Sequence, residues 1–264
     1  RADMLTFEIE LADADLLADV QDETGVPVHP RPSTLRMISD KLVQKRQLEA
    51  AGVPVPPFRP AGSPAALEAA LDELGTPAML KARRGGYDGR GNVVVEDGDD
   101  LAAALDAVGG DAMVEAFMDY DRELSVIGCL GQDDRDMFPV TETIHEQEIL
   151  RQTVTPARTG DAVKVEAREV ADQVLDVMDG RGVYGIELFE VDGDILLNEI
   201  APRPHNSGHW TIEGAATSQF AQHLRAVTGQ PLGSTAIRGP TAMANILGDV
   251  SEEQPARLDG IDQV

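Results

Sequence analysis

Cysteine is almost absent from this sequence. Cys129 is the single cysteine among 264 residues, so neither an internal disulfide nor a zinc site built from several thiolates can form. No apolar run approaches the roughly 20 residues that a membrane-spanning helix needs. The first residues also lack the basic and apolar regions of a secretory signal. These absences exclude a membrane partner and leave the cytoplasm as the default localisation.

Positive charge is also scarce. Asp and Glu number 47 against 22 Lys and Arg, which gives a formal net charge of −25. A chain without clustered cations is not expected to bind duplex nucleic acid. Such self-repulsion is a lever that halophilic proteins use, and we therefore predict a salt-loving source, with a merely acidic bacterial protein as the alternative. The only lysines are Lys41, Lys45, Lys81 and Lys164.

Periodic apolar residues predict four helices, at residues 33–52, 63–75, 99–109 and 170–178, each with a capping residue or a terminal glycine. Strand-like runs lie between them at residues 79–80, 93–95, 113–117, 124–127, 184–191 and 195–200. Helices and strands alternate irregularly, and some strands are adjacent. The pattern predicts an α+β or mixed α/β protein rather than a regular doubly wound sheet.

A glycine-rich, basic segment, KARRGGYDGRG, occupies residues 81–91 between two strand-like runs. Its glycines let the backbone turn tightly and expose N–H groups to anionic oxygens, and Lys81 adds a point charge for a phosphate. We predict phosphate binding here; a glycine-rich hairpin decorated with basic residues is the alternative. The segment matches neither a P-loop nor a dinucleotide-binding fingerprint. The glycines are Gly85, Gly86, Gly89 and Gly91.

Two strand-like runs carry Glu187 and Glu199 and are joined by a hairpin signal around Gly193. A two-residue turn would place Glu187 opposite Asn198, whereas a three-residue turn would place it opposite Glu199. Facing carboxylates repel unless a cation lies between them, and Mg²⁺ is commonly held by such oxygens together with nucleotide phosphates. The alternative is a solvated strand face without a ligand.

The segment NEIAPRPHNSGHW, residues 198–210, is dense in polar groups. His205 and His209 are four residues apart, as in some zinc sites on helices. Two prolines and Gly208 oppose a helix here, however, and the glutamate of the zinc-protease motif is missing, so zinc is not expected. Arg203 is better suited to hold a phosphate or another oxyanion.

Together these segments resemble the N5-carboxyaminoimidazole ribonucleotide synthase family of the ATP-grasp superfamily. The similarity runs from about Thr6 to about Gly233 and is most specific at residues 84–91 and 198–213, with further matches at 218–220 and 223–225. It implies an α+β ATP-grasp fold whose two α+β subdomains grip ATP. The two ends look cut, so we interpret the sequence as a fragment: 1–32 ends the N-terminal substrate domain, 33–230 is the ATP-grasp domain, and 231–264 begins the C-terminal domain.

The resemblance also implies roles for individual residues. Mg²⁺, or Mn²⁺, would bind Glu187 and Glu199, which favours the three-residue turn. The aminoimidazole would face Glu8 rather than Glu10. Bicarbonate and substrate would meet Tyr87, Asp88, Arg90, Arg203 and His205. The implied ATP contacts are Lys41, Lys81, Gly85, Gly86, Gly89, Gly91, Glu115, Ala116, Phe117, Glu123, His145 and Asn198.

The implied reaction is the ATP-dependent carboxylation of 5-aminoimidazole ribonucleotide by bicarbonate through carboxyphosphate, in purine biosynthesis, with a homodimer expected for the full-length protein. One alternative is another ATP-grasp ligase, such as a formate-dependent glycinamide ribonucleotide transformylase. A second is a non-catalytic module that senses ATP. The paired carboxylates Glu187 and Glu199 argue against the second, because a sensor need not keep two metal ligands.

The charge balance predicts a fold that is stabilised by salt. Raising KCl from millimolar to molar concentration shortens the screening length from about 30 Å at 0.01 M to about 3 Å at 1 M and so relieves self-repulsion. We expect the melting temperature, measured by circular dichroism, to rise across that range. A constant or falling melting temperature would contradict the halophilic interpretation.

Overall fold

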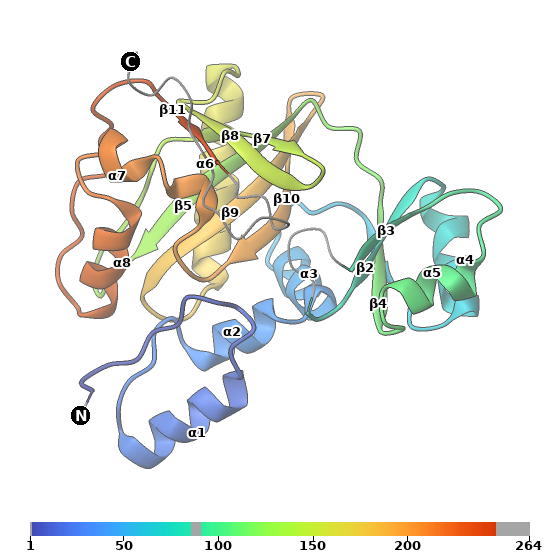
Figure 1. Ribbon diagram of the computed structural model, residues 1–264, viewed down its shortest axis with the longest axis horizontal. Coiled ribbons are helices and arrows are strands. Elements are labelled where there is room, and N and C mark those ends of the chain that lie inside the picture. Colours follow the sequence, from blue (N-terminus) through green and yellow to red (C-terminus); the bar gives the residue numbers. More distant parts are fainter. Residues whose placement is uncertain (1, 86–90, 247–264) are drawn as a thin grey trace.

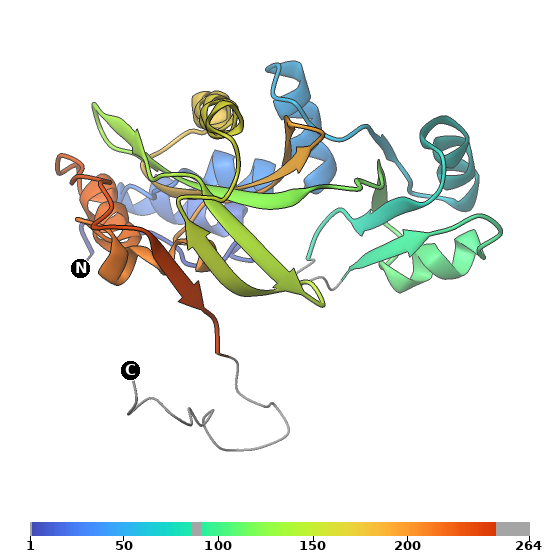
Figure 2. The same cartoon turned by 90° about the horizontal axis from the view of Figure 1, so that it is seen from above.

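The computed structural model describes residues 2–85 and 91–246. Two antiparallel sheets, each packed against helices, form two lobes that lie side by side in both ribbon views (Figures 1 and 2). The α+β prediction is confirmed. The predictions for Gly86, Tyr87, Asp88, Gly89 and Arg90, and for residues 247–264, fall outside the described residues.

The smaller lobe has four strands in the order β1-β4-β2-β3. Alternate strand residues such as Leu80, Val95 and Val114 are buried against Leu67 and Leu105 of the two helices. The strands are β1 (Phe58–Pro60), β2 (Ala78–Ala82), β3 (Asn92–Val95) and β4 (Ala112–Ala116), and the helices are α4 (Pro64–Leu74) and α5 (Leu101–Ala107).

The larger lobe has a seven-stranded sheet in which β10-β9-β5-β7-β8-β11 are neighbours and β6 pairs with β5. The neighbouring strands of this sheet are antiparallel in each of these pairs. The strands are β5 (Arg122–Leu130), β6 (Arg135–Met137), β7 (Thr141–Glu146), β8 (Ile149–Thr155), β9 (Gly182–Val191), β10 (Asp194–Ala201) and β11 (Thr241–Ala244).

Helices cover the two faces of this sheet differently. On one face, α6 (Asp161–Val177) packs on the apolar side chains of β5, β9 and β10. Gly128 permits that approach, because a Cβ there would lie 2.9 Å from the Leu175 side chain. On the opposite face lie η1 (Asn206–Gly208), α7 (Thr211–Gly214) and α8 (Gln219–Val227), with Trp210 buried against Phe138. The opposite face also carries the polar side chains of the candidate site.

The predicted single helix over residues 33–52 is wrong. The structure has α2 (Pro32–Ile38) and α3 (Lys41–Ala50), which are separated at Ser39 and Asp40. The Asp40 side chain accepts hydrogen bonds from the backbone N–H groups of Leu42 and Val43, so it caps a new helix. The apolar spacing is continuous across the break, which is why periodicity alone hid it. Because of this break, the start of α3 lies close to the end of β2.

The other predicted helices are confirmed, with Ser63 and Asp100 as the N-caps of α4 and α5. The helix predicted at 170–178 is the second half of α6, which begins at Asp161. The prediction missed α1 (Ala14–Thr24), α8, and the hairpin of β7 and β8. No helix within 2–85 and 91–246 is long and apolar enough to cross a membrane.

Asp40 gives a test of the helix break. Its carboxylate is buried and accepts hydrogen bonds from Arg83 and Arg84. Burial, the largest single influence, would raise the pKa of Asp40, but the hydrogen bonds from Arg83 and Val43 and the charges of Arg83 and Arg84 together outweigh it and hold the pKa below 3.8. The stabilisation is therefore present above pH 3.8 and is lost as the pH falls through the lowered folded-state value.

We expect Asp40→Asn to lower the free energy of unfolding at pH 7 by about 1–3 kcal/mol, since it keeps the cap but removes the charge. Asp40→Ala should cost about 1 kcal/mol more through loss of the cap. Urea unfolding at pH 7 and near pH 3 measures both, and the gap between wild type and Asn should narrow at the lower pH. Asp100→Asn, at a cap that accepts hydrogen bonds from the backbone N–H groups of Ala102 and Ala103, is the matched control and should be nearly neutral.

Candidate active site

A cleft of about 540 Å³ lies between the two sheets. The smaller lobe contributes Lys81 and Glu115, and the larger lobe contributes Glu187 and Glu199 from one hairpin. Of the predicted ATP and metal residues, the cleft brings together Lys41, Lys81, Glu115, Ala116, Phe117, Glu123, His145, Glu187, Asn198 and Glu199.

A buried ion cluster forms the back of the cleft. The Glu115 carboxylate lies 2.6 Å from Lys81 Nζ and 3.0 Å from Lys45 Nζ, and Lys45 also donates to the Leu197 carbonyl oxygen at 2.9 Å. Burial opposes ionisation of Glu115, but the two lysines outweigh it and lower its pKa to about 2. Lys45 was not predicted as a site residue. Its signal was its rarity as one of four lysines, at the position one helical turn after Lys41.

The hairpin of β9 and β10 corrects the predicted turn. Asp194 pairs with Val191, so the turn has two residues, Asp192 and Gly193, both with positive φ. The expected three-residue turn is wrong. Glu187 nevertheless faces Glu199, because a β-bulge between Leu197 and Glu199 shifts the register by one residue. The bulge, rather than the turn, therefore sets the two carboxylates side by side.

The two carboxylates experience different electrostatic environments. Burial, reinforced by the charge of Glu199, raises the pKa of Glu187 to about 7. Burial acts in the same direction on Glu199, but the ammonium group of Lys41, in contact with it, brings the pKa of Glu199 below its ordinary value. Lys41 is the first residue of α3, where the capped break places it over the cleft. Facing carboxylates with one cation beside them form a donor set suited to a divalent metal ion.

The far end of the cleft pairs an acid with a histidine. Glu123 on β5 contacts His145 on β7, and although burial opposes protonation, Glu123 raises the pKa of His145. Tyr120 stacks on Phe189 with ring centroids 4.7 Å apart. Phe189 also lines the cleft. With Ala116 and Phe117 nearby, this end combines apolar faces with a carboxylate.

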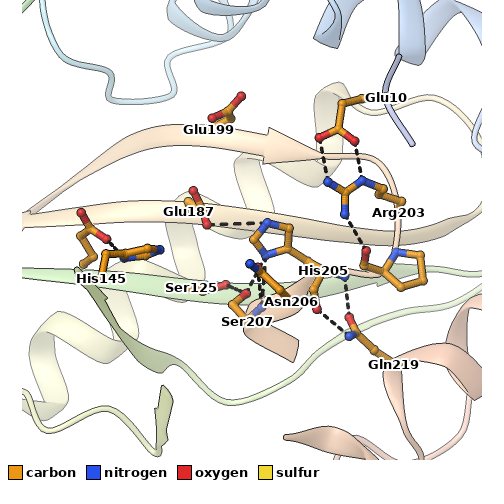
Figure 3. Close-up of polar contacts among 12 residues, drawn as sticks. Glu10, Ser125, His145, Glu187, Glu199, Arg203, His205, Asn206, Ser207 and Gln219 are labelled. Carbon is orange, nitrogen blue, oxygen red and sulfur yellow. Dashed lines mark hydrogen bonds and ion pairs between the residues drawn. The ribbon is translucent and has the colours of Figure 1, made fainter. Parts of the chain in front are cut away.

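The opposite end carries the predicted oxyanion residues. Arg203 makes a two-pronged ion pair with Glu10, and the pair joins the N-terminal segment to the loop after β10 (Figure 3). Glu8, predicted to face the substrate, is exposed, so Glu10 is the residue that the fold directs towards Arg203. A smaller hollow beside them is lined by Glu10, Lys41, Gly85 and Glu199, and so connects the site to one end of the glycine-rich segment.

His205 lies beneath these groups with its ring directed at the hairpin (Figure 3). Its Nε2 is 3.7 Å from Glu187, and burial together with the charge of Arg203 lowers the pKa of His205 to about 4. His209 instead stacks on Phe220, with ring centroids 5.7 Å apart. Within 2–85 and 91–246 no group of three or more His, Cys, Asp or Glu could hold a metal ion.

Comparison with known proteins identifies the family. The ATP-grasp domain model matches residues 46–220. The N5-carboxyaminoimidazole ribonucleotide synthase of Pseudomonas aeruginosa is 41% identical over 250 residues, which are 94% of this chain and 68% of that protein. The chain belongs to the N5-carboxyaminoimidazole ribonucleotide synthase family of ATP-grasp proteins. The synthase of Synechococcus elongatus is 39% identical, over 93% of this chain and 63% of its own length.

Solved structures of the N5-carboxyaminoimidazole ribonucleotide synthase family share the fold. The Aspergillus clavatus synthase complexed with ATP superposes with a TM-score of 0.89 at 39% identity, covering 94% of this chain and 66% of that one. The same enzyme in complex with ADP and 5-aminoimidazole ribonucleotide gives 0.88 at 38% identity. The chain thus spans about two thirds of these relatives, and 47% of the phosphoribosylaminoimidazole carboxylase of Ogataea methanolica.

Glu187 and Glu199 can be tested as metal ligands. Replacing either with Gln removes one anionic oxygen of the pair, so we expect the affinity for Mg·ATP to fall at least tenfold while affinity for metal-free ATP changes much less. Isothermal titration calorimetry with and without Mg²⁺ measures both. Asp194→Asn, an exposed carboxylate at the end of the same hairpin, is the control. Unchanged Mg·ATP affinity in both glutamine variants would rule out the metal assignment.

Proposed function

We propose that this chain is the ATP-binding core of an N5-carboxyaminoimidazole ribonucleotide synthase, which carboxylates 5-aminoimidazole ribonucleotide with bicarbonate at the expense of ATP. The observation that carries the proposal is the order of groups along one cleft. Lysines and facing carboxylates line the cleft, and Arg203 and His205 lie beside it through their contacts with Glu10 and Glu187. Family membership and the nucleotide complexes of relatives support it.

The nucleotide would lie with its phosphates between Lys41 and Lys81 and its base towards Phe117, Tyr120 and Phe189. The lysines are the point charges that a triphosphate requires; Lys81 lies on β2 of the smaller lobe and Lys41 at the start of α3. Glu123, held by His145, is suited to accept hydrogen bonds from ribose hydroxyls. Backbone N–H groups of residues 85–91 would cover the phosphates.

Glu187 and Glu199 fit a magnesium ion, because two acidic oxygens that face each other across a hairpin are unfavourable without a cation between them. Asn198, at the bulge, adds a neutral oxygen donor to the same wall. When bound, Mg²⁺ would neutralise phosphate charge and orient the transferred phosphoryl group.

In the proposed reaction an oxygen of bicarbonate attacks the γ-phosphorus of ATP, the bond to the β–γ bridging oxygen breaks, and ADP and carboxyphosphate form. The substrate amine then attacks the carboxyl carbon, the C–O bond to phosphate breaks, and the nitrogen loses a proton. Both partners of the first step are anions that repel each other. Arg203 and Lys41 would offset that repulsion where negative charge accumulates.

The alternatives differ in their second substrate. A formate-dependent ligase would release ADP with formate instead of bicarbonate, and an ATP sensor would release none. The paired carboxylates disfavour a sensor, and the family match favours bicarbonate.

We expect ADP release from Mg·ATP that depends on bicarbonate and is not supported by formate. Because the chain spans about two thirds of its relatives, 5-aminoimidazole ribonucleotide should stimulate it less than it stimulates the full-length Pseudomonas aeruginosa enzyme, the reference in the assay. Coupled ADP detection and incorporation of labelled bicarbonate measure the two steps.

Arg203→Lys should reduce the bicarbonate-dependent rate by roughly 10²-fold, the cost of losing an oxyanion donor. Arg158→Lys, which alters an exposed arginine paired with Glu142, is its control. ADP release that depends on formate would contradict the proposed function and support the formate-dependent ligase.

A further inference from the structure

A chain of buried hydroxyl groups ends on the His205 ring (Figure 3). Ser125 on β5 and Ser207 in η1 are both buried, and their Oγ atoms are 2.7 Å apart. Ser207 Oγ lies 2.8 Å from His205 Nδ1. Neither serine was singled out from the sequence. Together with His205 Nε2 near Glu187, they connect the interior of the larger sheet to the candidate metal ligands.

The direction of this chain follows from its two ends. The Ser207 backbone N–H is shared between Asn206 Oδ1 at 2.8 Å and His205 Nδ1 at 3.4 Å. A proton on Nδ1 would bring two donors together, so Nδ1 acts as an acceptor there. At the other side of the ring, Nε2 lies 3.7 Å from Glu187 Oε1, an oxygen that can accept its proton. The accepting role of Nδ1 therefore leaves the single proton of the neutral ring on Nε2.

The hydroxyls then have assigned roles. Since Nδ1 accepts, Ser207 Oγ–H donates to it, and Ser125 Oγ–H donates to Ser207 Oγ. The backbone that carries the ring is held on two sides. The His205 N–H donates to Gln219 Oε1 at 2.9 Å, and Gln219 Nε2 donates to the His205 carbonyl oxygen at 2.6 Å. On its other side, a Cβ at Gly185 would lie 2.6 Å from the His205 Cβ, so only glycine permits this approach.

We propose that Ser207 and Ser125 are positioning residues that fix His205 as the Nε2–H tautomer, which makes His205 a neutral hydrogen-bond donor to the reacting oxyanion. The catalytic half of this inference rests on the proposed function; the tautomer does not. A donor aimed where charge develops stabilises the transferring groups without giving up its proton. The opposite tautomer would present a lone pair and make His205 a base that removes the proton of bicarbonate.

Nuclear magnetic resonance can read the tautomer without any turnover. Long-range ¹H–¹⁵N correlations distinguish Nε2–H from Nδ1–H rings, and the chain has only five histidines to assign. We expect His205 to show the Nε2–H pattern at pH 7. In Ser207→Ala the pattern should become a mixture of tautomers, and in Ser125→Ala it should change in the same direction but less.

Thr155→Val is the matched control, because it breaks a second pair of buried hydroxyls, Thr141 Oγ1 and Thr155 Oγ1, also 2.7 Å apart. Thr155→Val should lower the melting temperature about as much as Ser207→Ala does, but it should leave the His205 spectrum unchanged. An Nδ1–H or doubly protonated ring in the parent chain, or an unchanged spectrum in Ser207→Ala, would overturn the positioning role.

Activity tests the donor role separately. Ser207→Ala should lower kcat for bicarbonate-dependent ADP release by roughly tenfold with little change in KM for ATP, and His205→Ala by roughly 10²-fold. His205→Gln, which keeps an N–H donor, should recover part of that loss. A mixed tautomer in Ser207→Ala with unchanged kcat would overturn the donor role. Failure of the proposed function would instead appear as no bicarbonate dependence in the parent chain, with the tautomer still decided by its spectrum.

Discussion

The buried cluster of Lys45, Glu115 and Lys81 is the interaction on which the geometry of the cleft depends. Its three side chains come from α3, β4 and β2, and the Leu197 carbonyl oxygen that Lys45 also binds belongs to β10. This one ion cluster therefore holds both sheets and α3, the helix between them, in place. Removing one partner from a buried ion pair costs about 3–5 kcal/mol because the other charge is left uncompensated. The same cluster also holds Lys81 in the cleft.

That cluster explains how a chain of net charge −25 can be suited to a triphosphate. Lys41, Lys45 and Lys81 are three of its four lysines, and all three meet at the cleft, while Lys164 lies on α6. The acidic remainder of the chain opposes approach of an anion at long range. Salt screens that repulsion over about 8–10 Å, whereas the lysines act at contact distance within partly buried surroundings, where screening is weaker.

The sequence was sufficient wherever the determining signal was local. Ser63 and Asp100 cap helices through their own neighbours, so α4 and α5 were predicted with nearly correct ends. The break at Asp40 was missed because the apolar spacing continues across it, while the contact from Arg83, which follows β2, comes from a distant part of the sequence. The bulge at Asn198 was missed for a similar reason: the register of a hairpin beyond its turn depends on packing across the whole sheet.

The candidate site shows the same difference between residues with a local signal and residues that depend on long-range contacts. The hairpin signal and the polar segment at residues 198–210 predicted Glu187, Glu199 and Arg203 as candidates, and the fold brings all three to the cleft or its border. That Glu10 rather than Glu8 pairs with Arg203 is a tertiary contact, which no local pattern could show. Lys45, Ser125 and Ser207 carried no motif at all. Lys45 and Ser125 act through partners more than 50 residues away in sequence, and no local pattern encodes such a partner. Ser207 lies only two residues from His205 but depends on Ser125 for its place in the chain of hydroxyls.

A regularity among the ion pairs connects these observations. Lys41 contacts Glu199, Lys81 contacts Glu115, His145 contacts Glu123, and Arg203 contacts Glu10. Each of these cations thus lies against a carboxylate, so none bears the full cost of an uncompensated charge. A triphosphate bound with a divalent metal ion brings charges of both signs. In the proposed complex the phosphates would take over Lys41 as the metal takes over Glu199, so that binding would exchange partners instead of creating new charge in the cleft. Glu115 differs, since two lysines share it and Lys81 can turn to a phosphate while Lys45 keeps the carboxylate neutralised. The exchange is therefore possible at the nucleotide without loosening the cluster that holds the two lobes together.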